Sequence, residues 1–369
     1  MTDFFRQKRL AVPLLLSGLL IAVLLLIHFL HTPSHEGPWQ TAQQRLPEIR
    51  MDNDSVQIKQ LRDFRYYPDG QIREARYQQQ EYSLAALHAV WFGISHFSEN
   101  GLAHTFLSFE FANGDYLVAS VEARMRPAQT YHPMQGLLRQ YHKIIVLGTE
   151  ADIIGLRSHV RGERVLLYPL QLNAEQRRHL LRGIIADAQA ISTQPVFYNT
   201  LLDNCTTSLL RHDPQHRLWR DLLDYRVLLP GYSDAYAQQR GWLEPERDLR
   251  QWRREVRVDA NAAPDDANFS QQIRSPHYQR LSLSLLLLQQ DMYQGQWVHS
   301  SGVVRGFADP EHYWIEDNQL RRVAIEPSAL ALPWLGQVVE VFGRFQFYPE
   351  QGRLIELDAI RPLAQQQSQ

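Results

Sequence analysis

An uncharged stretch of 21 residues, Leu10–Leu30, constrains this 369-residue chain more than any other feature. It is long enough to cross a hydrocarbon core of about 30 Å as a helix. Arg6, Lys8 and Arg9 lie just before it, and the next basic side chain is Arg45. Because Lys and Arg are enriched on the cytoplasmic side of a span, we expect a cytoplasmic N-terminus and an external location for the rest of the chain.

A cleaved signal peptide is the alternative interpretation of this segment. Its apolar region would be shorter, and residues 29–33 hold no small-x-small cleavage site. We therefore expect an uncleaved, single-pass anchor. The net charge of −2 predicts no nucleic-acid partner, and the 44% of apolar residues are enough for sizeable cores.

The residues after the anchor alternate between strand and helix patterns. Two apolar runs, 102–111 and 115–124, flank Ala112-Asn113-Gly114 and predict a hairpin with a three-residue loop. Extended runs also occur at 55–66, 73–82, 143–147 and 164–170. Asn173 begins a capping-box pattern that opens a long amphipathic helix. These patterns predict an α+β domain with a mainly antiparallel sheet.

The C-terminal part differs, because five short alternating runs between 296 and 363 predict a small all-β barrel or sandwich similar to the oligonucleotide/oligosaccharide-binding (OB) fold. The expected organisation is a cytoplasmic N-terminus (1–9), a transmembrane anchor (10–30), a linker or tether (31–48), the α+β domain (49–260), a linker and helix (261–295, with the helix at about 277–293), the β domain (296–363) and a disordered tail (364–369).

The only cysteine, Cys205, follows Asp203 and Asn204 and precedes an apolar run that predicts a helix. A lone buried cysteine usually packs as a small hydrophobe. At a helix N-terminus, however, the positive end of the dipole favours the nucleophilic thiolate. The backbone N–H groups of Cys205 and Thr206 would then be placed to stabilise an oxyanion.

A thiol nucleophile needs a base and a third group that orients this base. His104 lies in the first strand of the hairpin. With a three-residue loop, Phe111 faces Asp115 and His104 lies opposite Glu122, with Cβ atoms about 4.5–5.5 Å apart. A two-residue loop would set Thr105 against Glu122. The alternative for each residue is structural: a strand histidine is more often satisfied in the core, and Glu122 can be a surface charge.

A thiol on a helix, with a histidine and a carboxylate on neighbouring strands, is the layout of papain-like enzymes. The chain order is reversed here, which a circularly permuted core allows because a triad is defined by geometry. The sequence has no zinc-binding, phosphate-loop, dinucleotide or Gly-x-Ser-x-Gly motif. We therefore expect no cofactor and no metal.

The chain resembles the Lnb N-terminal periplasmic domain family over about residues 50–260. Its most specific motifs are His104-Thr-Phe-Leu-Ser-Phe and Asn204-Cys-Thr-Thr. The matching segments are 56–66, 103–124, 139–141, 156–157, 161–163, 197–207 and 224–232. The resemblance implies a permuted papain-like, NlpC-type core with Cys205 as nucleophile and His104 as base. Glu122 as the third member rests on the hairpin alone, and Tyr198, Asn204 and His96 are expected neighbours.

The activity named for Lnb-type proteins is lipoprotein N-acylation, and it implies a bacterial inner-membrane protein whose bulk is periplasmic. In this chain a β domain takes the place of the further membrane segments of characterised members. We therefore expect a Cys–His acyltransferase or acyl hydrolase that acts on lipid or lipoprotein acyl esters through a thioester. The alternatives are an NlpC-like cell-wall peptide amidase with the same pair, and a non-catalytic scaffold whose β domain binds an envelope protein.

Overall fold

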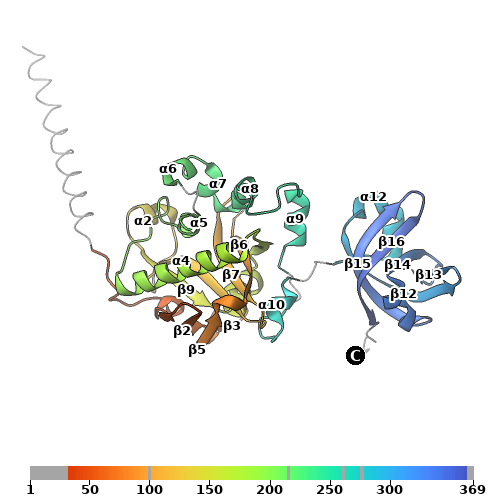
Figure 1. The fold of residues 1–369 in the computed structure, drawn as a ribbon, viewed down its shortest axis with the longest axis horizontal. Helices are drawn as coiled ribbons and strands as arrows, with labels where there is room; N and C mark the ends of the chain where they lie inside the picture. Colours follow the sequence, from red (N-terminus) through yellow and green to blue (C-terminus); the bar gives the residue numbers. More distant parts are fainter. Residues whose placement is uncertain (1–31, 99–100, 214–216, 259–261, 275–277, 364–369) are drawn as a thin grey trace, which may run out of the picture. The chain divides into compact units, whose positions relative to one another are not determined.

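The computed structural model describes residues 32–98, 101–213, 217–258, 262–274 and 278–363 (Figure 1). The chain divides into two compact units. Unit 1 comprises residues 1–249 and 260–273, and unit 2 comprises 250–259 and 274–369. The expected anchor at 10–30 lies outside the described residues. Within the described ranges, no helix has the length and apolar character that a membrane crossing requires.

Unit 1 is built on an eight-stranded sheet with the order β1-β2-β9-β8-β7-β6-β10, and β5 pairs with β2. Its strands are β1 (Glu48–Met51), β2 (Ser55–Arg62), β5 (Tyr77–Ser83), β6 (Leu87–His96), β7 (Ala103–Phe111), β8 (Tyr116–Arg124), β9 (His142–Gly148) and β10 (Arg164–Pro169). The pairings are antiparallel apart from a short parallel contact between β2 and β9. A separate hairpin joins β3 (Arg65–Tyr66) and β4 (Ile72–Glu74).

Helices cover both faces of this sheet. The larger elements are α2 (Pro133–Leu137), α3 (Glu150–Gly155), the π-helical turn η3 (Leu156–Val160), α4 (Ala174–Thr193), α5 (Cys205–Leu210), α6 (Leu218–Asp221), α7 (Tyr225–Leu228), α8 (Ser233–Gln239) and α10 (Phe269–Gln272). Thr105 of β7 contacts Thr206 of α5, whereas Ser108 donates to Glu150 of α3. Because odd and even residues of a strand face opposite sides, α5 and α3 lie on opposite faces. The predicted α+β class is confirmed.

The predicted hairpin and its register are also confirmed. The Phe111 N–H donates to the Asp115 carbonyl over 2.9 Å, and Gly114 adopts the left-handed φ of +86° that the three-residue loop requires. The β7–β8 ladder keeps this register but reaches only from Glu110 to Leu107, which pairs with Ala119. The expected direct pairing of His104 with Glu122 is therefore not formed.

Two features of unit 1 differ from the sequence analysis. Strand β6, which lies between β7 and β10, has no counterpart among the expected strands. Residues 34–43, in the stretch expected to be a tether, bond to other segments of unit 1. The Ser34 N–H donates to His142 Nε2 over 3.1 Å, and the Gln40 N–H donates to the Met125 carbonyl over 2.9 Å.

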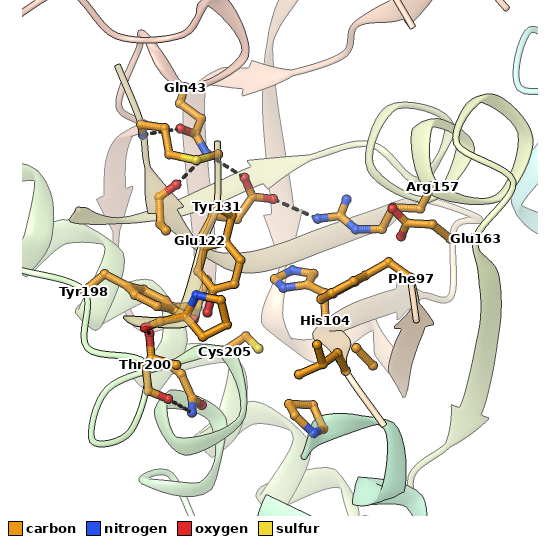
Figure 2. Close-up of a pocket in the computed structure, with 18 of the residues that line it drawn as sticks. Gln43, Phe97, His104, Glu122, Tyr131, Arg157, Glu163, Tyr198, Thr200 and Cys205 are labelled. Atoms are coloured by element: carbon orange, nitrogen blue, oxygen red, sulfur yellow. Dashed lines mark hydrogen bonds and ion pairs between the residues drawn. The ribbon is translucent and has the colours of Figure 1, made fainter. Parts of the chain in front are cut away.

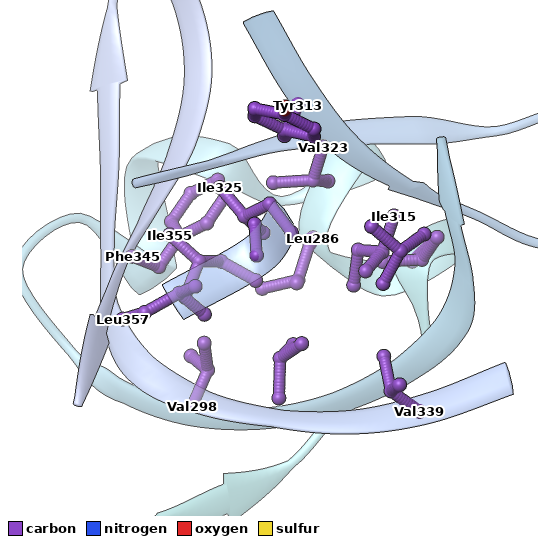
Figure 3. Close-up of a cluster of buried hydrophobic side chains, with 14 residues drawn as sticks. Leu286, Val298, Tyr313, Ile315, Val323, Ile325, Val339, Phe345, Ile355 and Leu357 are labelled. Carbon is purple, nitrogen blue, oxygen red and sulfur yellow. The ribbon is translucent and has the colours of Figure 1, made fainter. Parts of the chain in front are cut away.

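Unit 2 contains a ring of strands, because β12 pairs with both β13 and β15 while β14 pairs with both β13 and β16. These strands are β12 (Trp297–Ala308), β13 (Glu311–Glu316), β14 (Arg322–Glu326), β15 (Val338–Tyr348) and β16 (Gly352–Pro362). They confirm the five expected strands, and the OB-like assignment stays a prediction. Two short helices, α11 (Leu283–Leu288) and α12 (Gln290–Tyr293), replace the single expected helix. Leu286 of α11 joins the buried cluster inside the ring (Figure 3).

Substitution of Gly93 on β6 tests how tightly β6 packs against β7, the strand that carries His104. A Cβ at this position would lie 2.2 Å from the ring of Phe106, its cross-strand partner on β7. The Phe106 ring is stacked on His104, with 6.4 Å between ring centroids. Because this ring is fully buried and cannot move away, Gly93→Ala should lower the unfolding free energy by about 1–3 kcal/mol in urea titrations.

The matched control is Gly114→Asn. An added Cβ there meets no described atom within 4 Å, and Asn tolerates the left-handed φ. A loss for Gly93→Ala no larger than the loss for this control would contradict the packing.

Candidate active site

A cavity of about 660 Å³ opens in unit 1 beside the first residues of β7 and the last residues of β8. His104, Glu122, Tyr198, Asn204 and Cys205 line it, so five of the seven predicted site residues share one cavity (Figure 2). Across the described ranges, no group of three or more His, Cys, Asp or Glu side chains could hold a metal ion.

Cys205 is the first residue of α5, and the helix cap fixes its place. The Asn204 side-chain oxygen accepts from the N–H groups of Thr206 at 2.8 Å and Thr207 at 2.9 Å. The Thr207 hydroxyl in turn accepts from the Asn204 N–H, which completes a capping box. The Asn204 amide also donates to the Thr200 carbonyl over 2.7 Å. Asn204 therefore positions Cys205, whose exposed fraction is 5%.

An ion pair ties the start of this helix to the sheet. The buried Lys143 ammonium of β9 lies 2.6 Å from the Asp203 carboxylate. Ser208 and Arg211 of the next helical turn donate to the same carboxylate oxygen over 2.9 and 2.8 Å. Asp203 therefore fixes the helix that carries the thiol to β9, and β9 is the neighbour of β8, the strand that carries Glu122.

His104 reaches Glu122 through a serine hydroxyl. Its Nε2 lies 2.7 Å from the Ser120 Oγ, and this hydroxyl donates to Glu122 Oε1 over 2.9 Å. Because the only proton of the hydroxyl points to the carboxylate, Nε2 must carry the proton of the His104–Ser120 bond. The lone pair of the neutral ring is then on Nδ1, which makes no hydrogen bond to the described residues. Figure 2 shows the imidazole and the thiol at the same cavity.

The Glu122 carboxylate is held charged. It accepts from Arg157 over 3.0 Å and from the Gln43 amide over 3.1 Å. Burial opposes its ionisation, but the charges of Arg157 and Arg62 outweigh burial and hold the pKa of Glu122 well below its usual range. Burial acts on His104 in the other direction. Together with the charge of Arg157, it lowers the pKa of His104 to about 3, so the ring is neutral at pH 7.

Two tyrosines form a wall of the cavity beside the thiol. The rings of Tyr131 and Tyr198 meet edge to face, with 6.2 Å between centroids. Burial raises the pKa of Tyr198 well above 10, and the neighbouring Cys205 adds to this shift. Burial likewise raises the pKa of Tyr131. Both phenols therefore keep their protons. The Tyr198 hydroxyl bonds to the Tyr131 hydroxyl and accepts from the Cys205 N–H, so this N–H is not free to stabilise an oxyanion.

Two predicted residues lie outside the cavity lining. The Thr206 N–H is already bonded to Asn204, so it is not free to stabilise an oxyanion. The His96 ring lies between two backbone carbonyls, with Nε2 3.1 Å from Gly231 and Nδ1 3.3 Å from Arg164. It therefore connects the segment after α7 to the sheet, which is a structural role.

Four residues of the site have no role in the sequence analysis: Ser120, Arg157, Gln43 and Tyr131. The sequence could have indicated Ser120, because it lies two residues before Glu122 and therefore on the same face of the strand. Arg157 lies in a matching segment of the family but carries no motif of its own. Gln43 belongs to the stretch that we expected to be a tether, so nothing in the sequence placed it against a strand.

Residues 73–231 match the family model of the Lnb N-terminal periplasmic domain. The match agrees with the predicted family resemblance, and the matched residues include His104, Ser120, Glu122 and Cys205. The match supports a periplasmic location for unit 1. No curated protein and no solved structure matches the chain.

The protonation state and tautomer of His104 can be measured by ¹⁵N NMR of the imidazole in the full chain. We expect a neutral ring with the proton on Nε2 from pH 5 to pH 8. Ser120→Ala should weaken this preference for Nε2, whereas Ser120→Thr, which keeps a hydroxyl, should retain it. A His104 ring that titrates near pH 6.5, or that carries its proton on Nδ1, would contradict this chain of hydrogen bonds from His104 through Ser120 to Glu122, which we call the relay.

The lowered pKa of His104 also predicts how the free energy of unfolding depends on pH. The pKa of His104 is about 3 in the folded chain and about 6.5 in an unfolded chain. Between these values the unfolded state binds more protons, so the free energy of unfolding must fall as the pH falls from 6.5 towards 3. His104→Gln should flatten this part of the pH profile.

Proposed function

We propose that unit 1 is a Cys–His acyltransferase or acyl hydrolase that acts on lipid or lipoprotein acyl esters through a thioester on Cys205. One observation carries the proposal. The only thiol of the chain and a neutral histidine with its Nδ1 lone pair open line the same cavity, and a serine connects this histidine to a buried carboxylate. This is the arrangement that thiol catalysis needs: a nucleophile, a base and a group that orients the base.

The reaction would proceed in two transfers. His104 Nδ1 takes the proton of the thiol while the sulfur attacks the ester carbonyl carbon. The C–S bond forms, the C–O bond breaks, and the alcohol leaves with the proton from His104. An amine or water then attacks the thioester and gives a proton to His104, and the Cys205 sulfur leaves and recovers that proton.

The Ser120–Glu122 relay supports the step in which His104 is charged. Burial and Arg157 disfavour an imidazolium, which suits His104 to accept a proton only transiently. The negative charge of Glu122, which is separated from His104 by the Ser120 hydroxyl, favours the imidazolium and so opposes the effect of burial and Arg157. The Tyr131 hydroxyl would be the donor for the oxyanion, in place of the Cys205 and Thr206 N–H groups, which are bonded to Tyr198 and Asn204.

The lining of the cavity favours an acyl chain as the substrate group. Apolar side chains dominate it outside the relay, among them Phe97, Leu102, Met125, Leu228 and Leu229. Burial of a hydrocarbon chain against such a wall contributes about 0.8 kcal/mol per methylene. The second candidate is a cell-wall peptide amidase with the same Cys–His pair. The Arg161–Glu163 ion pair, with 3.6 Å between its charged atoms, also lines the cavity and would suit charged peptide groups.

The test uses the full chain in phospholipid vesicles with an isotope-labelled acyl chain and a diacylglyceryl-cysteine peptide as acceptor. We expect release of lysophospholipid and labelled acyl-peptide or fatty acid, measured by mass spectrometry. Cys205→Ala and His104→Ala should each lower the rate by about 10³-fold or more, because each removes a member of the catalytic pair.

The matched control is His88→Gln. His88 is exposed on β6, eight residues before the His96 end, and this variant should keep the wild-type rate. Full lysophospholipid release by Cys205→Ala would contradict the proposal. Cysteine-dependent cleavage of cell-wall peptides without acyl release would select the second candidate, and inactivity on both substrates would favour the scaffold.

A further inference from the structure

Large apolar side chains are exposed on the segments whose neighbouring residues line the cavity. We call six of them the apolar rim: Met134, Leu138, Leu202, Trp219, Leu223 and Tyr225. Their exposure is high for residues of this kind, reaching 75% for Trp219 and 88% for Leu223. A cluster of such side chains on a soluble surface marks an interaction site.

The rim has one half on and beside α2 and the other on α6 and α7, and sequence neighbours of both halves line the cavity. Tyr131 and Pro133, at the start of α2, line one side, and residues 228–230, at the end of α7, line another. The Thr200 hydroxyl donates to the Pro133 carbonyl over 2.8 Å, so the loop that carries Leu202 lies against α2. Figure 1 shows α2, α6 and α7 along one edge of unit 1.

Insertion of residues 10–30 in a membrane would bring one side of the rim close to the bilayer. The uncharged stretch ends at Leu30, and Ser34 is already bonded to His142 at the start of β9. Four residues span at most about 14 Å. The next residue, Lys143, bonds through its N–H to the Val196 carbonyl, at the start of the loop that leads to Leu202. A membrane-inserted 10–30 segment would therefore hold this side of the rim within reach of the lipid surface.

The residue types of the rim also fit a lipid surface better than a protein interior. Trp219 and Tyr225 combine an apolar ring with a polar group, and such rings are enriched at the headgroup level of membranes. Leu138 and Leu223 supply apolar side chains that can enter the boundary of the acyl chains.

We propose that the apolar rim is the surface through which unit 1 docks onto the lipid bilayer, with the cavity mouth facing the headgroups. The docking itself requires no chemistry at Cys205, so it goes beyond the proposed function. Where that function holds, docking would let an acyl ester reach the thiol without leaving the membrane surface.

The test measures the depth of single fluorophores in the full chain. In a Cys205→Ser background, Leu138→Cys, Leu223→Cys and Tyr67→Cys are each labelled with an environment-sensitive dye. The labelled chains are reconstituted in phosphatidylcholine–phosphatidylglycerol vesicles that contain doxyl-labelled lipid. Tyr67 is the control, because it is an exposed apolar residue in the turn between β3 and β4.

We expect doxyl quenching several-fold stronger at positions 138 and 223 than at position 67. Leu223→Glu added to the Leu138→Cys chain should reduce quenching at 138, because both sides of the rim dock as one surface. Equal quenching at the three positions, or quenching at 138 and 223 that appears only after an envelope protein is added, would overturn the proposal. Because no arm measures catalysis, failure of the acyl-transfer assay leaves this result interpretable.

Discussion

The buried carboxylate of Glu122 is the interaction on which the rest of the site depends. Arg157, Gln43 and Ser120 all donate to it, from η3, from the segment before β1 and from the same strand. The ionised carboxylate accepts the hydrogen bond of the Ser120 hydroxyl, and this fixes the tautomer of His104. Without the carboxylate, the buried Arg157 would lose its ion-pair partner, and Ser120 would be free to donate to the histidine instead. The base would then present a proton, not a lone pair, on Nδ1.

A second set of polar contacts places the nucleophile. The Asn204 cap makes Cys205 the first residue of α5, and Asp203 ties that helix to Lys143 on β9. The thiol lies at the start of α5, on one face of the sheet, and the imidazole belongs to strand β7; both line the same cavity. The β7–β8 ladder ends at Leu107 and Ala119, and the unpaired ends of the two strands carry His104 and Glu122, which line the cavity.

Local patterns predicted much of the fold. The Ala112-Asn113-Gly114 loop gave the β7–β8 register, Asn173 marked the start of α4, and alternation located the five main strands of unit 2. Strand β6 was not predicted, because its apolar run is interrupted by Gly93 and lacks a clear alternation of apolar and polar residues. Its conformation depends on pairing with strands on both sides, which is information that no short window contains.

The sequence predicted five of the residues that line the cavity, but it did not predict the hydrogen bonds between them. The expected place of His104 opposite Glu122 assumes that the ladder continues to the end of the hairpin, and it does not. The Ser120 relay follows from this interruption. In the stretch expected to be a tether, residues 34–43 make long-range contacts with Met125 and His142, which polar composition cannot reveal.

The most direct measurement is mass spectrometry of the Cys205 peptide after the wild-type chain is expressed in a bacterial envelope and quenched rapidly in acid. The account predicts a fatty-acyl adduct on Cys205 that hydroxylamine removes and that accumulates when the amine acceptor is depleted. An unmodified Cys205 in a chain that is actively transferring acyl groups, or an acyl adduct on a different residue, would contradict it.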